Sequence, residues 1–189
     1  YQNYHETKAH TSAEFPYNTY LCSIPLDFPG VPLHWHDELE LVVIKRGQGF
    51  VSVDFDKRLV HSGDIIIIPP RCLHAIEQDD TFKMEYENII FKPDLLSSGA
   101  NDLCMIQYIV PLLDGSLPIE YFLTPALGSF EALSNCIRQI DLVCADQTPG
   151  WQLAVKSSLF NFFFLLISER QKKTVSTSSN SKSLEKMKT

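Results

Sequence analysis

The sequence predicts a mainly β fold, a closed barrel with a polar pocket inside it, followed by a pair of C-terminal helices. About seven short apolar stretches lie between residues 17 and 91, separated by glycine, proline and aspartate turns. Many short strands with regular turns are typical of a sandwich or closed barrel. After residue 95 the apolar residues recur at intervals of three and four instead, which indicates helices.

The composition is that of a globular protein large enough to bury a substantial core, with 189 residues of which 44% are hydrophobic. Its five cysteines are dispersed, which favours reduced thiols over a disulfide framework and gives no support for a CxxC-type zinc site. The longest uncharged apolar run near the end, residues 159–167, has nine residues, whereas a transmembrane helix needs roughly 20. We therefore expect a cytoplasmic protein without a membrane partner.

The net charge of −7 is unevenly distributed. Residues 170–189 hold six of the 16 basic residues and only one of the 23 acidic residues. The preceding residues are therefore strongly acidic, and such a surface repels a phosphate backbone. Nucleic-acid binding by this part of the chain is not expected.

The expected strands follow one another closely along the chain. They cover residues 17–24, 39–46, 50–55, 58–61, 65–68, 72–77 and 81–91. Residues 1–16 are polar without a sustained period and are expected to form an arm or loop. Three prolines exclude regular structure from residues 25–32. Gly47-Gln48-Gly49 is expected to form a hairpin loop between two strands.

Helices are expected over residues 102–113, 125–145 and 151–170, with residues 121–122 on a loop or short strand. The second helix carries an apolar seam at intervals of 3, 4, 3 and 4, formed by Phe130, Leu133, Ile137, Ile140 and Cys144. The third is apolar all round in its middle and so needs cover on both sides.

These patterns divide the chain into three parts. Residues 1–95 form the expected barrel, and residues 96–171 form a helical packing and dimerisation region. Residues 172–189 form a linker, because the stretch 172–183 is rich in serine and threonine. Residue 184 begins what looks like the first turn of a further helix.

The candidate site lies in two histidine-bearing stretches. If residues 34–40 form a strand, His34, His36, Glu38 and Glu40 point to one face, because side chains alternate along a strand. Burying four ionisable groups is costly unless they meet a ligand, a metal or each other. His74 follows the apolar strand 65–68, so the two stretches predict a polar pocket inside the barrel.

Two spacings in these stretches resemble the signatures of the cupin superfamily, whose fold is a double-stranded β-helix or jelly-roll barrel. His34-x-His36-x3-Glu40-x6-Gly47 resembles the first signature, and Gly63-x5-Pro69-x4-His74 resembles the second. The resemblance implies four ligand positions, at His34, His36, Glu40 and His74. Imidazoles plus a carboxylate suit a divalent transition metal such as Zn, Ni, Mn or Fe.

The second signature is matched only in part. Arg71 stands where cupins usually have glycine, and Gln78 stands where they have asparagine. The geometry of the turn before His74, and with it the metal geometry, is therefore not implied by the resemblance.

The order of the parts resembles the N-terminal sensor half of AraC/XylS-type transcriptional regulators, over roughly residues 15–170. This resemblance implies a bacterial, sugar-sensing or related small-molecule effector domain and a homodimer formed through the C-terminal helices. It also implies that DNA is bound only by a helix-turn-helix domain that would begin near residue 184 and is absent from this chain.

Several alternatives stay open at this point. The His/Glu set could hold a metal, could hydrogen-bond an effector without a metal, or could be a polar network without a ligand. Tyr20 and Tyr86 could stack on a sugar or could simply pack, and Cys72 is expected to be an inert core residue. Glu38 is expected at the pocket mouth or in solvent. The seam on the second helix could be core or dimer interface.

The alternative function is a metal-dependent cupin enzyme, an isomerase or dioxygenase, that uses the same four residues as a Lewis-acid centre. The appended helices and the linker favour a sensor without catalysis. The second signature supplies no evident general base beside the metal positions.

Overall fold

The computed structural model describes residues 2–98 and 102–186, and the side chains of residues 2–98 and 102–170. The chain forms two compact units, Tyr1–Leu127 and Gly128–Thr189. This division falls later than the change of sequence pattern near residue 95, because a short strand at residues 122–123 pairs with the barrel of the first unit.

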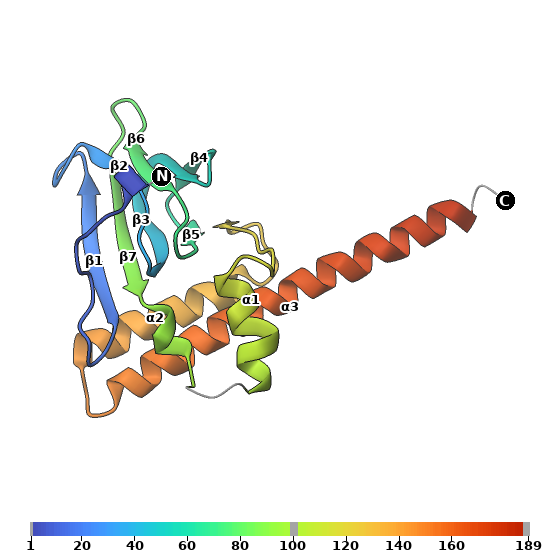
Figure 1. Ribbon diagram of the computed structural model, residues 1–189. Helices are drawn as coiled ribbons and strands as arrows, with labels where there is room; N and C mark the ends of the chain where they lie inside the picture. The colour runs from blue at the N-terminus through green and yellow to red at the C-terminus, as the bar shows by residue number, and fades with distance from the viewer. Residues whose placement is uncertain (1, 99–101, 187–189) are drawn as a thin grey trace. The chain divides into compact units, whose positions relative to one another are not determined.

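The first unit is built from eight strands in two antiparallel layers (Figure 1). The strands are β1 Tyr17–Ile24, β2 Gly30–His34, β3 Leu39–Val53, β4 Asp56–His61, β5 Ile65–Ile68, β6 His74–Gln78, β7 Met84–Phe91 and β8 Phe122–Leu123. One layer has the order β1-β7-β3-β5-β8, and the other has the order β2-β6-β3-β4. This is the predicted mainly β barrel of the cupin type.

Strand β3 belongs to both layers and joins them. Its residues 39–47 pair with β5 and β7, whereas residues 48–53 pair with β4 and β6. The change occurs at a register shift between Ile44 and Arg46, followed by Gly47 at φ 77°. A Cβ at Gly47 would overlap the main-chain oxygen of Lys83, so only glycine fits there. The predicted hairpin loop at residues 47–49 is therefore wrong: the strand bends at Gly47 and continues.

Strand β2 also departs from the prediction, because regular structure begins at Gly30 despite the prolines that flank it. Within the described part of the chain it pairs with β6 alone, with a register shift between Val31 and His34. An edge strand tolerates a proline that cannot donate to the ladder, and Pro32 takes that position.

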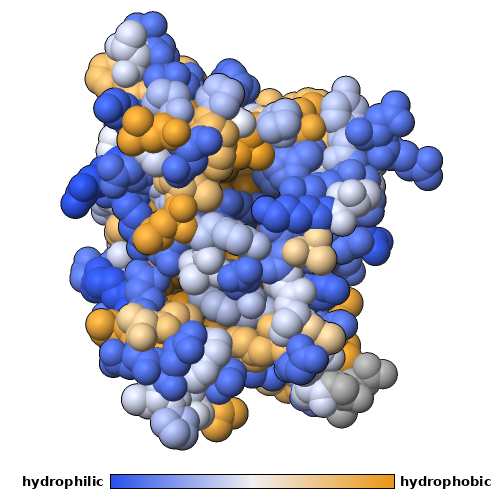
Figure 2. Space-filling view, turned by 90° about the vertical axis from the view of Figure 1, so that its left-hand side faces the viewer, coloured by the Kyte–Doolittle hydropathy of each residue, from blue (hydrophilic) through white to orange (hydrophobic). Residues whose placement is uncertain are grey.

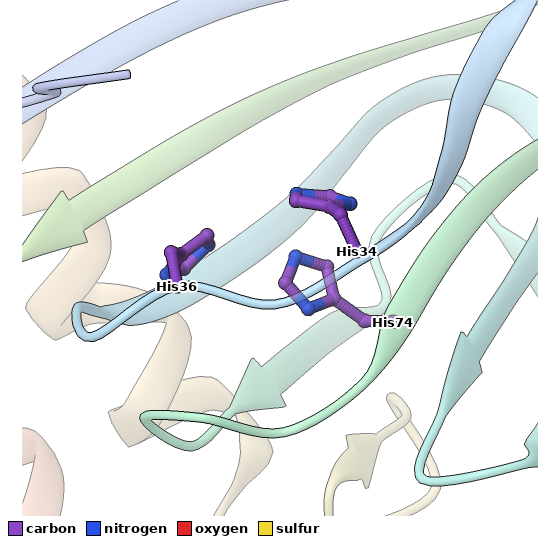
Figure 3. Close-up of side chains that lie close together, drawn as sticks. All are labelled: His34, His36 and His74. Carbon is purple, nitrogen blue, oxygen red and sulfur yellow. The ribbon is translucent and has the colours of Figure 1, made fainter. Parts of the chain in front are cut away.

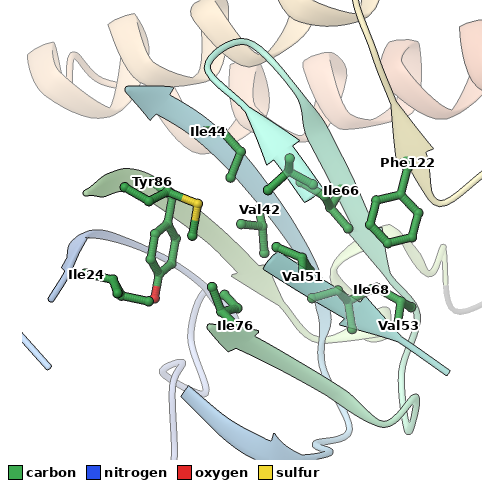
Figure 4. Close-up of a cluster of buried hydrophobic side chains, with 12 residues drawn as sticks. Ile24, Val42, Ile44, Val51, Val53, Ile66, Ile68, Ile76, Tyr86 and Phe122 are labelled. Carbon is green, nitrogen blue, oxygen red and sulfur yellow. The ribbon is translucent and has the colours of Figure 1, made fainter. Parts of the chain in front are cut away.

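The barrel interior is filled by apolar side chains from both layers (Figure 4). The cluster consists of Ile24, Val42, Ile44, Val51, Val53, Val60, Ile66, Ile68, Ile76, Met84, Tyr86 and Phe122. Since residues alternate along β3, the face that carries Val42 and Ile44 also carries Glu40. The polar site thus continues directly from the apolar core.

The segment expected to form a helix over residues 102–113 is helical but irregular. It contains the π-helical turn η3 Met105–Ile109 and the single α-helical turn α1 Val110–Leu113. A shorter 3₁₀ turn, η2 Pro93–Leu96, precedes it, and η1 Gln2–Tyr4 opens the described chain.

The second unit is a pair of helices, α2 Phe130–Asp146 and α3 Trp151–Lys186, which run antiparallel and pack on each other (Figure 1). The predicted seam of α2 is confirmed for Phe130, Leu133, Ile137 and Ile140, which are buried; Cys144 is only half-buried. The buried residues of α3 are Val155, Leu159, Phe162, Phe163 and Leu166. Gln147 ends α2 in the left-handed conformation, and its N–H caps the carbonyl of Val143.

Helix α3 differs from the prediction in two ways. Its backbone is helical through residues 172–183, where we expected a flexible linker, since a helix that is already formed extends at little cost. In addition, its portion Trp151–Arg170 is long and apolar enough, by length and composition, to cross a membrane. A core helix of a soluble protein meets the same criteria, and this one buries a whole face of side chains.

Candidate ligand and metal site

Three histidines converge inside the barrel from separate segments (Figure 3). His34 ends β2, His36 lies in the loop that follows, and His74 begins β6 directly opposite His34 in the ladder. We expected His34, His36 and Glu40 to share one face of a single strand over residues 34–40. The stretch is not one strand, because residues 35–38 separate β2 from β3. The loop nevertheless returns His36 to the same interior as Glu40, the second residue of β3.

Main-chain carbonyl groups orient all three imidazole rings in the same way. Nδ1 lies 2.8 Å from the oxygen of Pro32 in His34, 3.2 Å from that of Glu38 in His36, and 2.9 Å from that of Cys72 in His74. A carbonyl can only accept, so this network assigns the proton of each ring to Nδ1. The Nε2 atoms are then left to face the centre, and one ligand atom from each ring lies within 4.8 Å of the others.

Glu40 provides a buried negative charge between His36 and His74. Its Oε2 accepts a hydrogen bond from Nε2 of His36 at 3.0 Å and lies 3.3 Å from Nε2 of His74. Burial alone would raise the pKa of Glu40, but the two histidines outweigh it and hold that pKa far below its usual value. Glu40 is therefore ionised in the interior.

The histidines respond differently to this charge. Burial opposes a charge on His36, but the hydrogen bond and the negative charge of Glu40 prevail and raise its pKa. For His34, burial and the neighbouring His74 lower the pKa. His36 thus carries the positive charge that balances Glu40, and His34 stays neutral and able to bind a cation or accept a hydrogen bond.

These residues fit a divalent transition metal. Three imidazole Nε2 atoms and one carboxylate are a common donor set for such ions once His36 releases its Nε2 proton, and the Nδ1 contacts to carbonyl groups are the outer contacts that orient metal-binding histidines. Nε2 of His74 is buried, lies 3.3 Å from Oε2 of Glu40 and has no hydrogen-bond partner among the described residues.

The site opens into a cavity of about 340 Å³ inside the barrel. Tyr20 and Tyr86, both predicted as ligand-binding residues, line it together with Asn88 of β7. The Tyr86 hydroxyl and Oδ1 of Asn88 are buried and have no hydrogen-bond partner among the described residues, although the thiol of Cys22, a weak partner, lies beside Tyr86. Burial accordingly raises the pKa of Tyr86. Buried polar atoms without partners are costly, so this wall is suited to a polar ligand.

Sequence reasoning missed the contribution of the N-terminal segment. Glu6, Lys8 and His10 line the same cavity. Oε2 of Glu6 lies 3.0 Å from Nε2 of His10 and 3.4 Å from Nε2 of His34. The polar composition of residues 1–16 gave no periodic signal that could have placed them there.

The N-terminal segment is fixed to the residue between the two first histidines. The N–H of Glu6 donates to the oxygen of Trp35, and the N–H of Trp35 donates to the oxygen of Tyr4, each at 2.9 Å. The ring of His5 stacks on that of Trp35 at 4.2 Å. These contacts hold the N-terminal segment against the loop that carries His36.

Two other predictions can be compared with the structure. Glu38 is buried rather than in solvent, with a carboxylate oxygen 3.7 Å from Nδ1 of His36, because the loop folds back on itself. Cys72 is half-buried against the core cluster, and burial raises its pKa to about 11, which keeps it a protonated thiol at neutral pH.

The fold and the site together define a cupin barrel with a polar cavity. The family described as "AraC-like ligand binding domain" matches residues 22–163, and the chain belongs to this family.

The named relatives point in the same direction. The chain is 32% identical over 159 residues to the uncharacterised HTH-type transcriptional regulator YdeC of Bacillus subtilis, covering 84% of this chain and 54% of that protein. It is 26% identical over 72 residues to the uncharacterised HTH-type regulator YbfI of the same organism, covering 38% of this chain and 26% of YbfI. The matches thus span about half the length of YdeC and about a quarter of the length of YbfI.

Among solved structures, the chain is similar to a cupin protein from Bacteroides fragilis. It is 22% identical, with a TM-score of 0.38, and the match covers 49% of this chain and 75% of that one.

Proposed function

We propose that this chain is the effector-binding and dimerisation part of a transcriptional regulator, and that its effector is a small polar molecule, a sugar or a related metabolite. The observation that carries the proposal is the cavity wall, where the Tyr86 hydroxyl, Asn88 Oδ1 and His74 Nε2 lack hydrogen-bond partners among the described residues. A ligand rich in hydroxyl groups can both donate to and accept from such atoms. Aromatic and aliphatic neighbours complete the cavity and suit the C–H faces of a sugar ring.

A divalent metal is compatible with this proposal. His34, His36, His74 and Glu40 would hold the ion, and the ion would act as a Lewis acid toward an oxygen of the effector. The same residues would serve an enzyme, but the family and the regulators named among its relatives favour sensing.

The helical unit supports the dimerisation part of the proposal. Leu153, Phe160 and Phe164 of α3 are 74%, 41% and 64% exposed, so α3 carries apolar side chains outside its buried face. Single exposed apolar residues are common, as the scattered orange groups in Figure 2 illustrate, but three large ones on one helix favour association. We propose that a second copy of the chain packs there, in the cytoplasm.

DNA binding is assigned to a part of the regulator outside this chain. The chain corresponds to about half of YdeC, a protein named as a helix-turn-helix regulator. The acidic body of the chain does not suit a phosphate backbone, so we propose that it controls DNA binding rather than performing it.

A thermal-shift screen against a panel of sugars and small metabolites tests the effector proposal, because a ligand that binds only the folded state raises the unfolding midpoint. We expect at least one compound to raise the midpoint of the parent chain and not that of His74→Ala. His61→Ala is the matched control, since His61 is exposed on β4. A compound that stabilises the parent and His74→Ala equally would contradict binding at this site.

A further inference from the structure

The turn before His74 contains a residue in a conformation that side chains rarely adopt. Arg71 has φ 63°, in the left-handed region, at the position where the cupin signature usually has glycine. The turn is therefore kept without the glycine, at the cost of backbone strain. Such strain persists only where the surroundings compensate for it, which makes the contacts of Arg71 informative.

Arg71 contacts two consecutive residues of the loop that carries His36. Its main-chain N–H donates to the oxygen of His36 at 2.7 Å. Its guanidinium Nε donates to Oδ1 of Asp37 at 2.8 Å. One residue of the second histidine-bearing stretch thus holds the first stretch by both its main chain and its side chain.

The loop needs such contacts because residues 35–38 lie between β2 and β3 and have no continuous strand ladder. His36 is nevertheless placed accurately, with Nε2 at 3.0 Å from Glu40. The Arg71 and Asp37 side chains are 74% and 56% exposed, so their ion pair adds little to stability. The pair can instead fix the position of the loop that carries His36.

We infer that Arg71 is a positioning residue that holds the His36–Asp37 segment, so that His36 Nε2 stays beside Glu40 and faces His34 and His74. This inference rests on the proposed ligand cavity and deepens it. It adds to the four inward-facing residues a fifth, which acts from the outer surface and touches no ligand.

Co²⁺ is a suitable probe, because its absorption spectrum reports binding to histidine and carboxylate donors. We expect Arg71→Gly and Asp37→Asn to bind Co²⁺ about two- to five-fold more weakly than the parent chain, the range that one exposed ion pair can supply. The double variant should be no weaker than either single variant, because both remove the same contact. Arg46→Ala is the matched control, because Arg46 is 80% exposed and pairs with Glu85 away from the site. The Co²⁺ affinity of this variant should equal that of the parent.

A second readout separates this inference from the proposed metal function. In the metal-free chain, the imidazole N–H signals of His36 in ¹H–¹⁵N spectra should be sharp in the parent and in Arg46→Ala, and broadened in Arg71→Gly and Asp37→Asn. If the parent binds no Co²⁺, the metal part of the proposed function fails, and the His36 signals alone decide the role of Arg71. Unchanged His36 signals in both variants, or unchanged Co²⁺ affinity where the parent binds, would overturn the inference.

Discussion

Glu40 accepts a hydrogen bond from Nε2 of His36 at 3.0 Å, and each residue is only 3% exposed. Neither charge would be stable alone in the barrel interior, because the loss of hydration is costly. Each residue is held in its charged form by the other. The pair therefore stabilises the fold and also lines the cavity.

The charge of this pair predicts a stability difference between the parent and Glu40→Gln. At pH 5.5 we expect the variant to lose about 2 kcal/mol of unfolding free energy, because His36 loses the charge that stabilises its proton. Urea unfolding measures this. Glu85→Gln, at a largely exposed ion pair, should stay within about 0.5 kcal/mol of the parent.

The same pair predicts a pH dependence. Because the pKa of His36 is raised, its contribution to the unfolding free energy is fully present below the unfolded-state pKa of 6.5. That contribution is lost as the pH rises through the folded-state pKa. Because the pKa of Glu40 is lowered, its contribution to the unfolding free energy is present above the unfolded-state pKa of 4.5. That contribution is lost as the pH falls toward the folded-state pKa. The difference between parent and Glu40→Gln should therefore be largest between about pH 4.5 and 6.5. An equal difference at pH 5.5 and pH 8.5 would show that the pair is not an ion pair.

Tyr86→Phe separates ligand binding from stability. The substitution removes a buried hydroxyl that, among the described residues, has only the weak Cys22 thiol beside it, so the unfolding free energy should change little. Affinity for a compound found by thermal shift should fall roughly five- to ten-fold, which corresponds to one hydrogen bond of about 1 kcal/mol. Calorimetric titration measures it, with Tyr121→Phe as the control outside the cavity lining. Equal affinity in Tyr86→Phe and the parent would exclude contact with the hydroxyl.

Gly47→Ala tests the bend of β3. The added Cβ would overlap the Lys83 oxygen at a positive φ, so we expect a loss of more than about 1 kcal/mol in unfolding free energy. A Cβ at Gly128 would meet nothing within 4 Å, so Gly128→Ala should be neutral. If both variants unfold at the same urea concentration as the parent, the close approach at Gly47 is not present.

The proposed dimer is tested on α3. Phe164→Asp and Leu153→Asp should shift the chain from dimer to monomer in sedimentation while it stays folded, because both side chains are exposed. Ile137→Asp and Leu166→Asp should unfold the helical unit instead, since both residues are buried. A parent chain that sediments as a monomer at micromolar concentration would remove the dimer from the account.

Much of the fold could be predicted from the sequence because its signals are local. The bounds of β1 and β5 agree with the prediction, since turn residues flank both apolar runs. The heptad seam of α2 is equally direct, because it reflects one helix face. The path of β3 could not be predicted, since Gly47 and Gly49 suit a hairpin turn and a strand bend alike, and pairing with four other strands decides between them.

The candidate site was predictable in its residue types but not in its details. The signature spacings select His34, His36, Glu40 and His74, and the structure brings these four side chains close together; their role as ligand positions stays a prediction. The burial of Glu38 and the role of Trp35 depend on how a loop and the N-terminal segment fold back, and no periodicity encodes this.

The most direct test of the central claim follows the imidazole nitrogen signals of the histidines by NMR while a compound found by thermal shift is added. The account predicts shifts at Nε2 of His34, His36 and His74, with no change at exposed His61. Saturable binding that leaves all three interior signals unchanged would contradict capture of the ligand inside the barrel.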